Sequence, residues 1–256
     1  MTTKDITLAE ILRDGRRFAD RPRPVVDGLR TQIVDGIFEI FGATSPTTPT
    51  LIRASSFRSS DHMAYTPYGR MRGALLTQIV RLAMVSYASN DPFGDAVTAW
   101  RASEGASELV DYFDAIDDDE RARLATDVAA HAITLHQRIG DVPAQWRPRT
   151  AVRSRIRLAN AQVELRDHID LVIGSATSGT GTVLVDVTTS ALDENLERAL
   201  RFHALTEALR CGTAPRFVAA LSTSTGDMWR MFVDDALLQR AVHELLDTVR
   251  TTSEAM

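Results

Sequence analysis

The spacing of apolar residues changes at about Gly140, and the change divides the chain into two kinds of predicted structure. Ahead of this glycine, apolar residues recur every three or four positions, which is the period of one helix face. In residues 24–42 these positions are Val26, Leu29, Ile33, Ile37 and Ile40. We predict helices over residues 7–15, 24–42 and 71–88, with two more inside 105–139. The acidic run at 114–120 provides an N-cap for the last of them.

Beyond Gly140 the apolar period becomes two, which is the period of a strand with one buried face. Within residues 146–160, Val152, Ser154, Ile156 and Leu158 point one way, and Arg153, Arg155 and Arg157 point the other way. Further strands are predicted near 161–166, 168–173, 182–188, 215–223 and 229–233, with helices over 193–211 and 234–250. The Gly/Ser/Thr segment at 175–182 is typical of a hairpin turn. The pattern predicts a mixed α/β fold with a mostly helical front half.

Composition excludes several classes of protein. The 256-residue chain has a net charge of −5 and no apolar run near the roughly 18 residues that cross a bilayer. Its start shows no secretory signal, so we expect a cytoplasmic protein without a membrane partner. The single cysteine, Cys211, excludes an internal disulfide and a four-cysteine metal site. Lys4 is the only lysine, so no lysine is available in the body of the chain.

Two acidic residues stand in the otherwise apolar strand pair between His168 and Ser190. Asp170 lies near the start of the first strand, and Asp186 lies near the end of the second. Mg²⁺ prefers oxygen ligands, usually a few carboxylates together with waters. The two acids are therefore candidate ligands for Mg²⁺ or Mn²⁺. The alternative is that turn amides or an arginine satisfy both carboxylates.

Four segments around these acids occur in a recognisable order. They are Gly73-Ala-Leu-Leu-Thr77, His168-Ile-Asp170-Leu-Val, Val185-Asp186-Val-Thr188-Thr189-Ser190 and Gly212-Thr-Ala-Pro215-Arg216-Phe-Val218-Ala219. This series resembles the RecB-like branch of the PD-(D/E)XK nuclease superfamily over residues 51–250. The resemblance implies a restriction-endonuclease-like core, which is a small mixed sheet flanked by helices. We expect an N-terminal helical segment at 1–50 and a RecB-like domain at 51–256, helical over 51–140 and α/β over 141–256.

The catalytic positions that the resemblance implies are filled differently in this chain. The lysine position after the second acid holds Thr188, and the position of a helix histidine holds Thr77. The glutamine and tyrosine positions of the following helix hold Ala199 and His203. His203 is either a replacement ligand or acid–base group, or a histidine on a half-buried helix face. Since losing one charge-stabilising group typically costs about 10²–10³ in rate, these departures favour a protein without catalysis.

Five arginines near the start of the α/β part are candidate nucleic-acid ligands. They are Arg147, Arg149, Arg153, Arg155 and Arg157. Alternating arginines on one strand face can contact a phosphate backbone. The alternative is an exposed strand face in which arginine replaces the missing lysine.

Three functional hypotheses follow from these residues. The first is a degenerate, non-catalytic RecB-like protein that binds nucleic acid or acts as a scaffold in a bacterial DNA-processing, DNA-repair or defence system, without a cofactor. The second is a divergent DNA nuclease that uses Asp170 and Asp186 with Mg²⁺ or Mn²⁺. The third is a protein-interaction module whose helical front half docks a protein partner.

Overall fold

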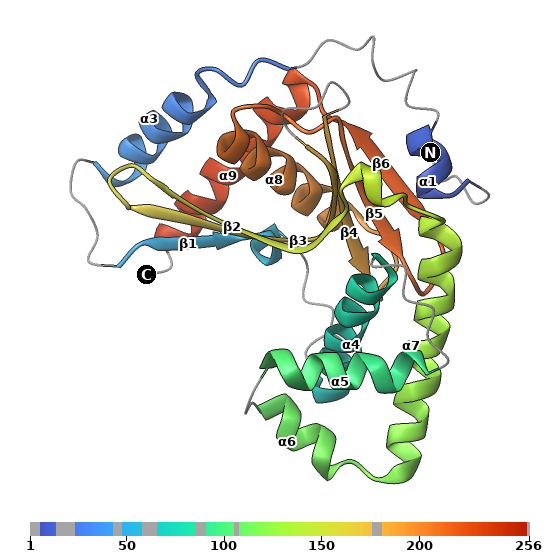
Figure 1. The fold of residues 1–256 in the computed structure, drawn as a ribbon. Helices are drawn as coiled ribbons and strands as arrows, with labels where there is room; N and C mark the ends of the chain where they lie inside the picture. The colour runs from blue at the N-terminus through green and yellow to red at the C-terminus, as the bar shows by residue number, and fades with distance from the viewer. Residues whose placement is uncertain are drawn as a thin grey trace.

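A mixed six-stranded sheet forms the centre of the part of the chain that the structure describes (Figure 1). The structure is a computed structural model that describes residues 6–13, 24–42, 48–57, 66–84, 91–104, 108–175 and 181–254. The strands are β1 (Thr50–Arg53), β2 (Arg149–Leu158), β3 (Val163–Gly174), β4 (Thr182–Thr188), β5 (Phe217–Ser222) and β6 (Met228–Phe232). Pairs β1–β3 and β4–β5 are parallel, and the other pairs are antiparallel. The predicted mixed α/β class is confirmed.

Strand β3 has two different neighbours along one of its edges. On the other edge, β2 pairs with it from Leu158↔Val163 to Arg149↔Val172. On the shared edge, β1 pairs with residues 163–166 and β4 pairs with residues 171–174. Neither β1 nor β4 therefore pairs with residues 167–170 on this shared edge. An opening remains between the end of β1 and the point where the pairing of β4 with β3 ends, although β4 stays paired with β5.

Helices cover the two faces of the sheet separately. One face carries α3 (Leu29–Phe41), η1 (Ala54–Phe57), α8 (Glu194–Cys211) and α9 (Asp235–Glu254). The other carries α1 (Leu8–Arg13) and a projecting lobe of α4 (Pro67–Met84), α5 (Pro92–Glu104), α6 (Glu108–Ala115) and α7 (Asp118–Ile139) (Figure 1). On β4, Leu184 belongs to the first core and Val185 to the second. Burial on both faces explains the continuous apolar runs of β4 and β5.

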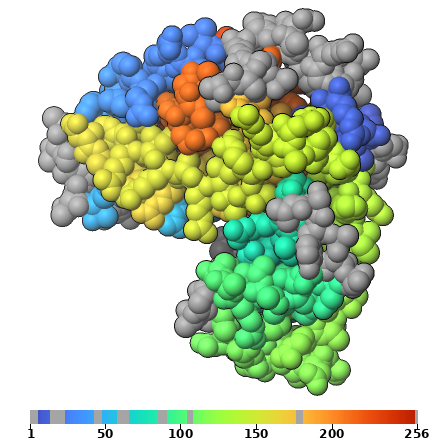
Figure 2. All heavy atoms as spheres, in the orientation of Figure 1, coloured from blue at the N-terminus to red at the C-terminus, as the bar shows by residue number. Residues whose placement is uncertain are grey.

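The helical lobe does not extend over the whole second face. On β2 and the first half of β3, the arginines that point away from α8 are exposed, namely Arg153, Arg155, Arg157 and Arg166, whereas Glu164 on the same face is buried. Figure 2 shows a hollow where the surface of β2 and β3 meets the lobe. In the described residues, no helix combines the length and the apolar character that a membrane crossing requires.

Several predicted elements are confirmed. The helices predicted over 193–211 and 234–250 are α8 and α9, and the two helices predicted inside 105–139 are α6 and α7. The expected N-cap is Asp117, whose carboxylate accepts a hydrogen bond from the Glu120 N–H at 2.7 Å. These elements have strong local signals, namely an amphipathic period and a capping side chain.

Other elements differ from the prediction. The strands predicted over 161–166 and 168–173 form the single strand β3, because pairing with β2 continues through Asp167. The pattern indicated neither β1 nor α5, so the stretch expected to be helical contributes a strand to the sheet. The helix predicted from residue 24 begins at Leu29, after Gly28 with a φ of 88°. Residues 176–180 of the predicted turn lie outside the described residues.

Candidate functional site

A cavity of about 640 Å³ opens where β3 lacks a strand neighbour between β1 and β4. The end of β1, η1, β2, β3, the end of β4 and α4 all contribute to its wall. Its charged lining consists of the arginines Arg53, Arg153, Arg155 and Arg166 and the aspartates Asp167, Asp170 and Asp186. The cavity therefore combines an acidic part with a basic part.

Both aspartates that the sequence analysis singled out line this cavity. Pairing of β3 with β4 ends at Leu171↔Val185, so the next positions along the two strands are Asp170 and Asp186. The side chain of Asp170 is 13% exposed and that of Asp186 is 6% exposed. Asp170 Oδ2 accepts a hydrogen bond from the Val187 N–H at 2.8 Å. Asp170 thus satisfies a backbone amide at the point where the strands separate.

A buried ion pair that the sequence analysis did not indicate lies beside these acids. His203 Nδ1 on α8 is 2.7 Å from Asp167 Oδ1 on β3, and both side chains are 1% exposed. The Thr206 hydroxyl donates to Asp167 Oδ2 at 2.5 Å, and the His168 N–H donates to Asp167 Oδ1 at 2.9 Å. On the other side of the ring, His203 Nε2 is 3.7 Å from Asp186 Oδ2. The imidazole therefore lies between two carboxylates.

The protonation state of His203 follows from this position. Burial alone would lower the pKa of His203, but the charges of Asp167 and Asp186 and the hydrogen bond to Asp167 outweigh it and raise the pKa to about 10. For Asp167, burial acts to raise the pKa, but the imidazolium and the donated hydrogen bonds hold that pKa below its usual range. At neutral pH the pair is therefore an imidazolium and a carboxylate.

The lysine and histidine positions of the resemblance hold threonines with local hydrogen bonds. Thr188 pairs with Ser222 on β5, and its hydroxyl oxygen accepts the Ser190 N–H at 3.1 Å. Thr77 on α4 lines the cavity, and its hydroxyl donates to the Gly73 carbonyl at 3.1 Å. Neither position supplies a charge. The third position, His203, supplies a positive charge, but that charge is inside the protein.

The five candidate arginines divide into two groups. Arg153 and Arg155 line the cavity, and Arg157 lies on the same exposed strand face. Arg147 follows η3 (Ala144–Trp146), and Arg149 begins β2 and donates to the Gly174 carbonyl at 3.5 Å. Those last two arginines lie outside the cavity lining.

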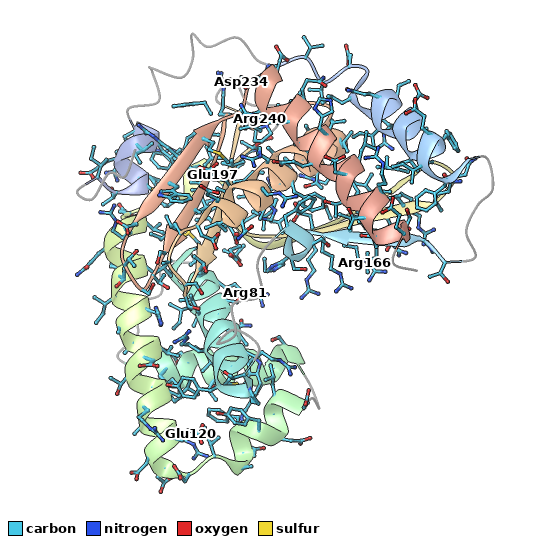
Figure 3. The ribbon with its side chains drawn as sticks, turned by 180° about the vertical axis from the view of Figure 1, so that it is seen from behind. Arg81, Glu120, Arg166, Glu197, Asp234 and Arg240 are labelled. Carbon is cyan, nitrogen blue, oxygen red and sulfur yellow. The ribbon has the colours of Figure 1, made fainter. Side chains whose placement is uncertain are left out.

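Two cavity arginines were not indicated by the sequence. Arg53 on β1 and Arg166 on β3 occupy paired positions, and Arg155 on β2 is the partner of Arg166 on the other side. Only the pairing of three distant segments brings these side chains together. Figure 3 labels Arg166, whose side chain extends toward the side on which the helical lobe lies. The signal in the sequence that could have indicated Arg166 is its place in β3, where Glu164, Arg166 and His168 occupy alternate positions and so share one face of the strand.

The side chains near Asp170 and Asp186 do not fit the divalent-metal ligand set that the resemblance implies. Among the described residues, no group of three or more His, Cys, Asp or Glu side chains could hold a metal ion. Asp186 already faces the imidazolium of His203 at 3.7 Å. A fixed positive charge at that distance opposes the binding of another cation at the same carboxylate. His168 lines the cavity with a pKa lowered by burial and by Arg153, so it is neutral.

The comparisons with known proteins do not assign the chain to a family. No protein-family model matches it, and no curated protein is significantly similar to it. A solved structure described as "Crystal structure of SSO0001" aligns with a TM-score of 0.32 at 10% sequence identity. The alignment covers 86% of this chain and 84% of that chain. So distant a likeness identifies neither a fold family nor a function.

Proposed function

We propose that this chain binds nucleic acid on its arginine-rich sheet face and does not cleave it. In this proposal it is a degenerate RecB-like protein with a restriction-endonuclease-like core, acting in a DNA-processing assembly. The observation that carries the proposal is the cavity between β1, β3 and β4, which arginines from three strands line together with three aspartates. The electrostatics of the face support binding, and the buried imidazolium supports the loss of cleavage.

The sheet face is strongly basic although the chain is acidic. Its arginines are Arg53, Arg153, Arg155, Arg157 and Arg166, and they share the face with Glu164. Strands lie about 4.8 Å apart and alternate residues about 6.5–7 Å apart, so these groups are close together. The six side chains carry a charge of +4, and the three aspartates of the adjoining cavity reduce the sum to +1, whereas the whole chain carries −5. A local concentration of arginine on an acidic protein favours binding of a polyanion.

Arginine is well suited to phosphate. Its planar guanidinium presents five donors and remains charged at every physiological pH, so it can hold a phosphodiester through two donors at once. Contacts of this kind fix a nucleic acid on a protein surface without selecting a base sequence. We therefore expect binding that depends on salt more than on sequence.

The neighbourhood of the two aspartates supports a protein without cleavage. The order of elements, with an acid on β3, an acid on β4, helix α8 and then the parallel strand β5, is the order that the resemblance implies. The imidazolium of His203 lies 3.7 Å from Asp186 Oδ2, but its side chain is 1% exposed and is held by Asp167. A buried cation of this kind cannot orient a water in the cavity as a lysine would.

Binding is tested with a fluorescently labelled single-stranded and double-stranded DNA, followed by anisotropy over a range of salt concentrations. We expect wild-type protein to bind, and the double variant Arg53→Ala/Arg153→Ala to bind more weakly with a shallower salt dependence. Arg240→Ala/Arg250→Ala is the matched control, because it removes two exposed arginines from α9, and Arg240 is well separated from Arg166 in Figure 3. Equal binding by all three proteins would contradict the proposal. Complete indifference to DNA would favour the protein-interaction hypothesis.

A divergent active nuclease is the second candidate, since Asp170 and Asp186 do line one cavity. It is distinguished by incubating supercoiled plasmid and single-stranded DNA with the protein and Mg²⁺ or Mn²⁺. Our proposal predicts no nicking and no shortening of either substrate. Cleavage by wild-type protein that disappears in Asp186→Ala would reject the non-catalytic proposal and support the active nuclease.

A further inference from the structure

Glu164 is a buried carboxylate on the solvent-facing side of the sheet, and three arginines cover it. Its side chain is 3% exposed, whereas those of Arg155, Arg157 and Arg166 are 53%, 58% and 48% exposed. A carboxylate is normally found outside on such a face because burial of an unpaired charge is costly. Here the guanidinium groups replace the lost water, and the carboxylate lies beneath them.

The hydrogen bonds distribute the three arginines over the two carboxylate oxygens. Glu164 Oε2 accepts from Arg155 Nη2 at 2.5 Å and from Arg157 Nε at 3.1 Å. Glu164 Oε1 accepts from Arg166 Nε at 2.6 Å. Each arginine gives Glu164 one donor of the five that a guanidinium carries. The three guanidinium groups are about half exposed, and Glu164 holds them together at one place on the sheet face, with N–H donors left over for a ligand.

Three guanidinium groups this close together repel one another, and without Glu164 they would spread apart in solvent. Glu164 stays ionised, because the hydrogen bond from Arg155, followed by those from Arg166 and Arg157, outweighs burial and lowers its pKa to about 2. One carboxylate against three arginines leaves a surplus charge of +2. Holding long side chains in place before binding reduces the entropy lost on binding.

We propose that Glu164 holds Arg155, Arg157 and Arg166 as a preformed receptor for phosphate oxyanions. The ligand is either the phosphodiester backbone of a nucleic acid or a free inorganic polyphosphate. Glu164 is a positioning residue, since it acts through the arginines and is itself covered. The nucleic-acid form of the inference rests on the proposed function, whereas the polyphosphate form does not.

Glu164 either acts only through its negative charge or positions the three arginines, and these two explanations predict opposite results for Glu164→Gln. If only net charge mattered, removing a negative charge from a basic face would tighten anion binding and steepen its salt dependence. If Glu164 positions the arginines, the variant binds more weakly, by about tenfold or more, because three free side chains must then be ordered when the anion binds. The salt dependence then becomes shallower, because fewer arginines contact phosphate simultaneously.

The test compares wild type, Glu164→Gln and Glu39→Gln. Glu39 is an exposed glutamate on α3, on the opposite side of the sheet, so its variant changes the net charge equally. Binding of a labelled single-stranded oligonucleotide is followed by anisotropy, and binding of inorganic tripolyphosphate by calorimetry. Thermal unfolding establishes a temperature at which all three proteins are folded. Glu164→Asp, which keeps the negative charge but shortens the side chain that reaches the arginines, provides a second variant if Glu164→Gln does not fold.

We expect Glu164→Gln and Glu164→Asp to weaken binding of both probes, and Glu39→Gln to leave binding unchanged or slightly tighter. Unchanged or tighter binding by Glu164→Gln overturns the receptor but leaves the proposed function standing. If wild type binds tripolyphosphate but not the oligonucleotide, the receptor stands and the proposed function fails. If wild type binds neither probe, both are overturned.

Discussion

The buried pair of His203 and Asp167 makes the stability of this protein depend on pH in a specific direction. His203 has a pKa of about 10 in the folded chain, against an ordinary value of 6.5. Between these two pH values the folded state retains a proton that the unfolded state has released. Stability is therefore fully present below about pH 6.5 and is lost as the pH rises through 10.

The size of the effect follows from the shift in pKa. One pKa unit corresponds to about 1.36 kcal/mol, so a shift of this size contributes on the order of a few kcal/mol to stability at neutral pH. The perturbation is His203→Gln, which keeps a polar side chain but removes the positive charge. It leaves Asp167 and Asp186 buried without their counter-charge, and breaking a buried pair in this way costs about 3–5 kcal/mol.

The assay is urea unfolding of wild type and His203→Gln, followed by fluorescence, at several pH values from 6.5 to 10. We expect wild type to be more stable at pH 6.5, and the difference between the two proteins to shrink steadily toward pH 10. Among the described residues few other side chains titrate in this window, because they include no lysine and the pKa of Tyr68 and that of Tyr112 are raised to about 12. The contribution of Cys211 is common to both proteins and cancels in the difference.

A difference in stability that stays constant from pH 6.5 to 10 would show that His203 is neutral, and the reasoning about the ion pair would be refuted. Asp167→Asn provides a second check, because it removes the main cause of the raised His203 pKa. In that variant the histidine ring should lose its proton closer to its ordinary pKa, and the NMR shift of its ring protons measures this directly.

Three other predictions follow from single contacts. Replacing Asp117 with alanine removes the N-cap of α7 and should cost about 1 kcal/mol in thermal unfolding, whereas Asp119→Ala, inside the first turn, should cost less; equal losses would contradict the cap. Tyr68→Phe removes the hydrogen bond from the hydroxyl to Asp127 at 2.7 Å and should cost roughly 0.5–1.5 kcal/mol, and an unchanged unfolding midpoint would argue against that bond. Restoring a lysine with Thr188→Lys should not produce plasmid nicking with Mg²⁺ or Mn²⁺, because the buried imidazolium remains beside the acid pair; nicking by this variant would show that the missing lysine was the only defect.

The parts of the fold that sequence could predict have local causes. The amphipathic period and the acidic cap of α7, and the apolar runs of β4 and β5, depend on residues close together in the chain. β1 is four residues long and is stabilised by parallel pairing with β3, more than 100 residues away in the sequence. A pattern within a short window contains no information about such a partner. For the same reason Arg53 could not be connected with Arg166.

The site was predictable to a similar extent. The sequence pointed to Asp170 and Asp186 because they interrupt apolar strands, and the structure places both in one cavity. It did not indicate Asp167, which lies in a stretch where charged and apolar residues alternate. Its burial against α8 becomes visible only when His203 is placed opposite it. The sequence did not indicate Glu164 either. Its neighbours in β3 and β2 are exposed arginines, and only the structure shows that their side chains bury its carboxylate.

The central claim is that the exposed face of β1, β2 and β3 binds the nucleic-acid backbone. The most direct measurement is the anisotropy of a labelled single-stranded DNA titrated with wild-type protein at a series of salt concentrations. The claim predicts that log K falls linearly with log salt, and that Arg53→Ala/Arg153→Ala lowers the magnitude of this slope by about 0.7 for each lost phosphate contact. A slope that is the same for this variant, wild type and the control Arg240→Ala/Arg250→Ala would contradict it.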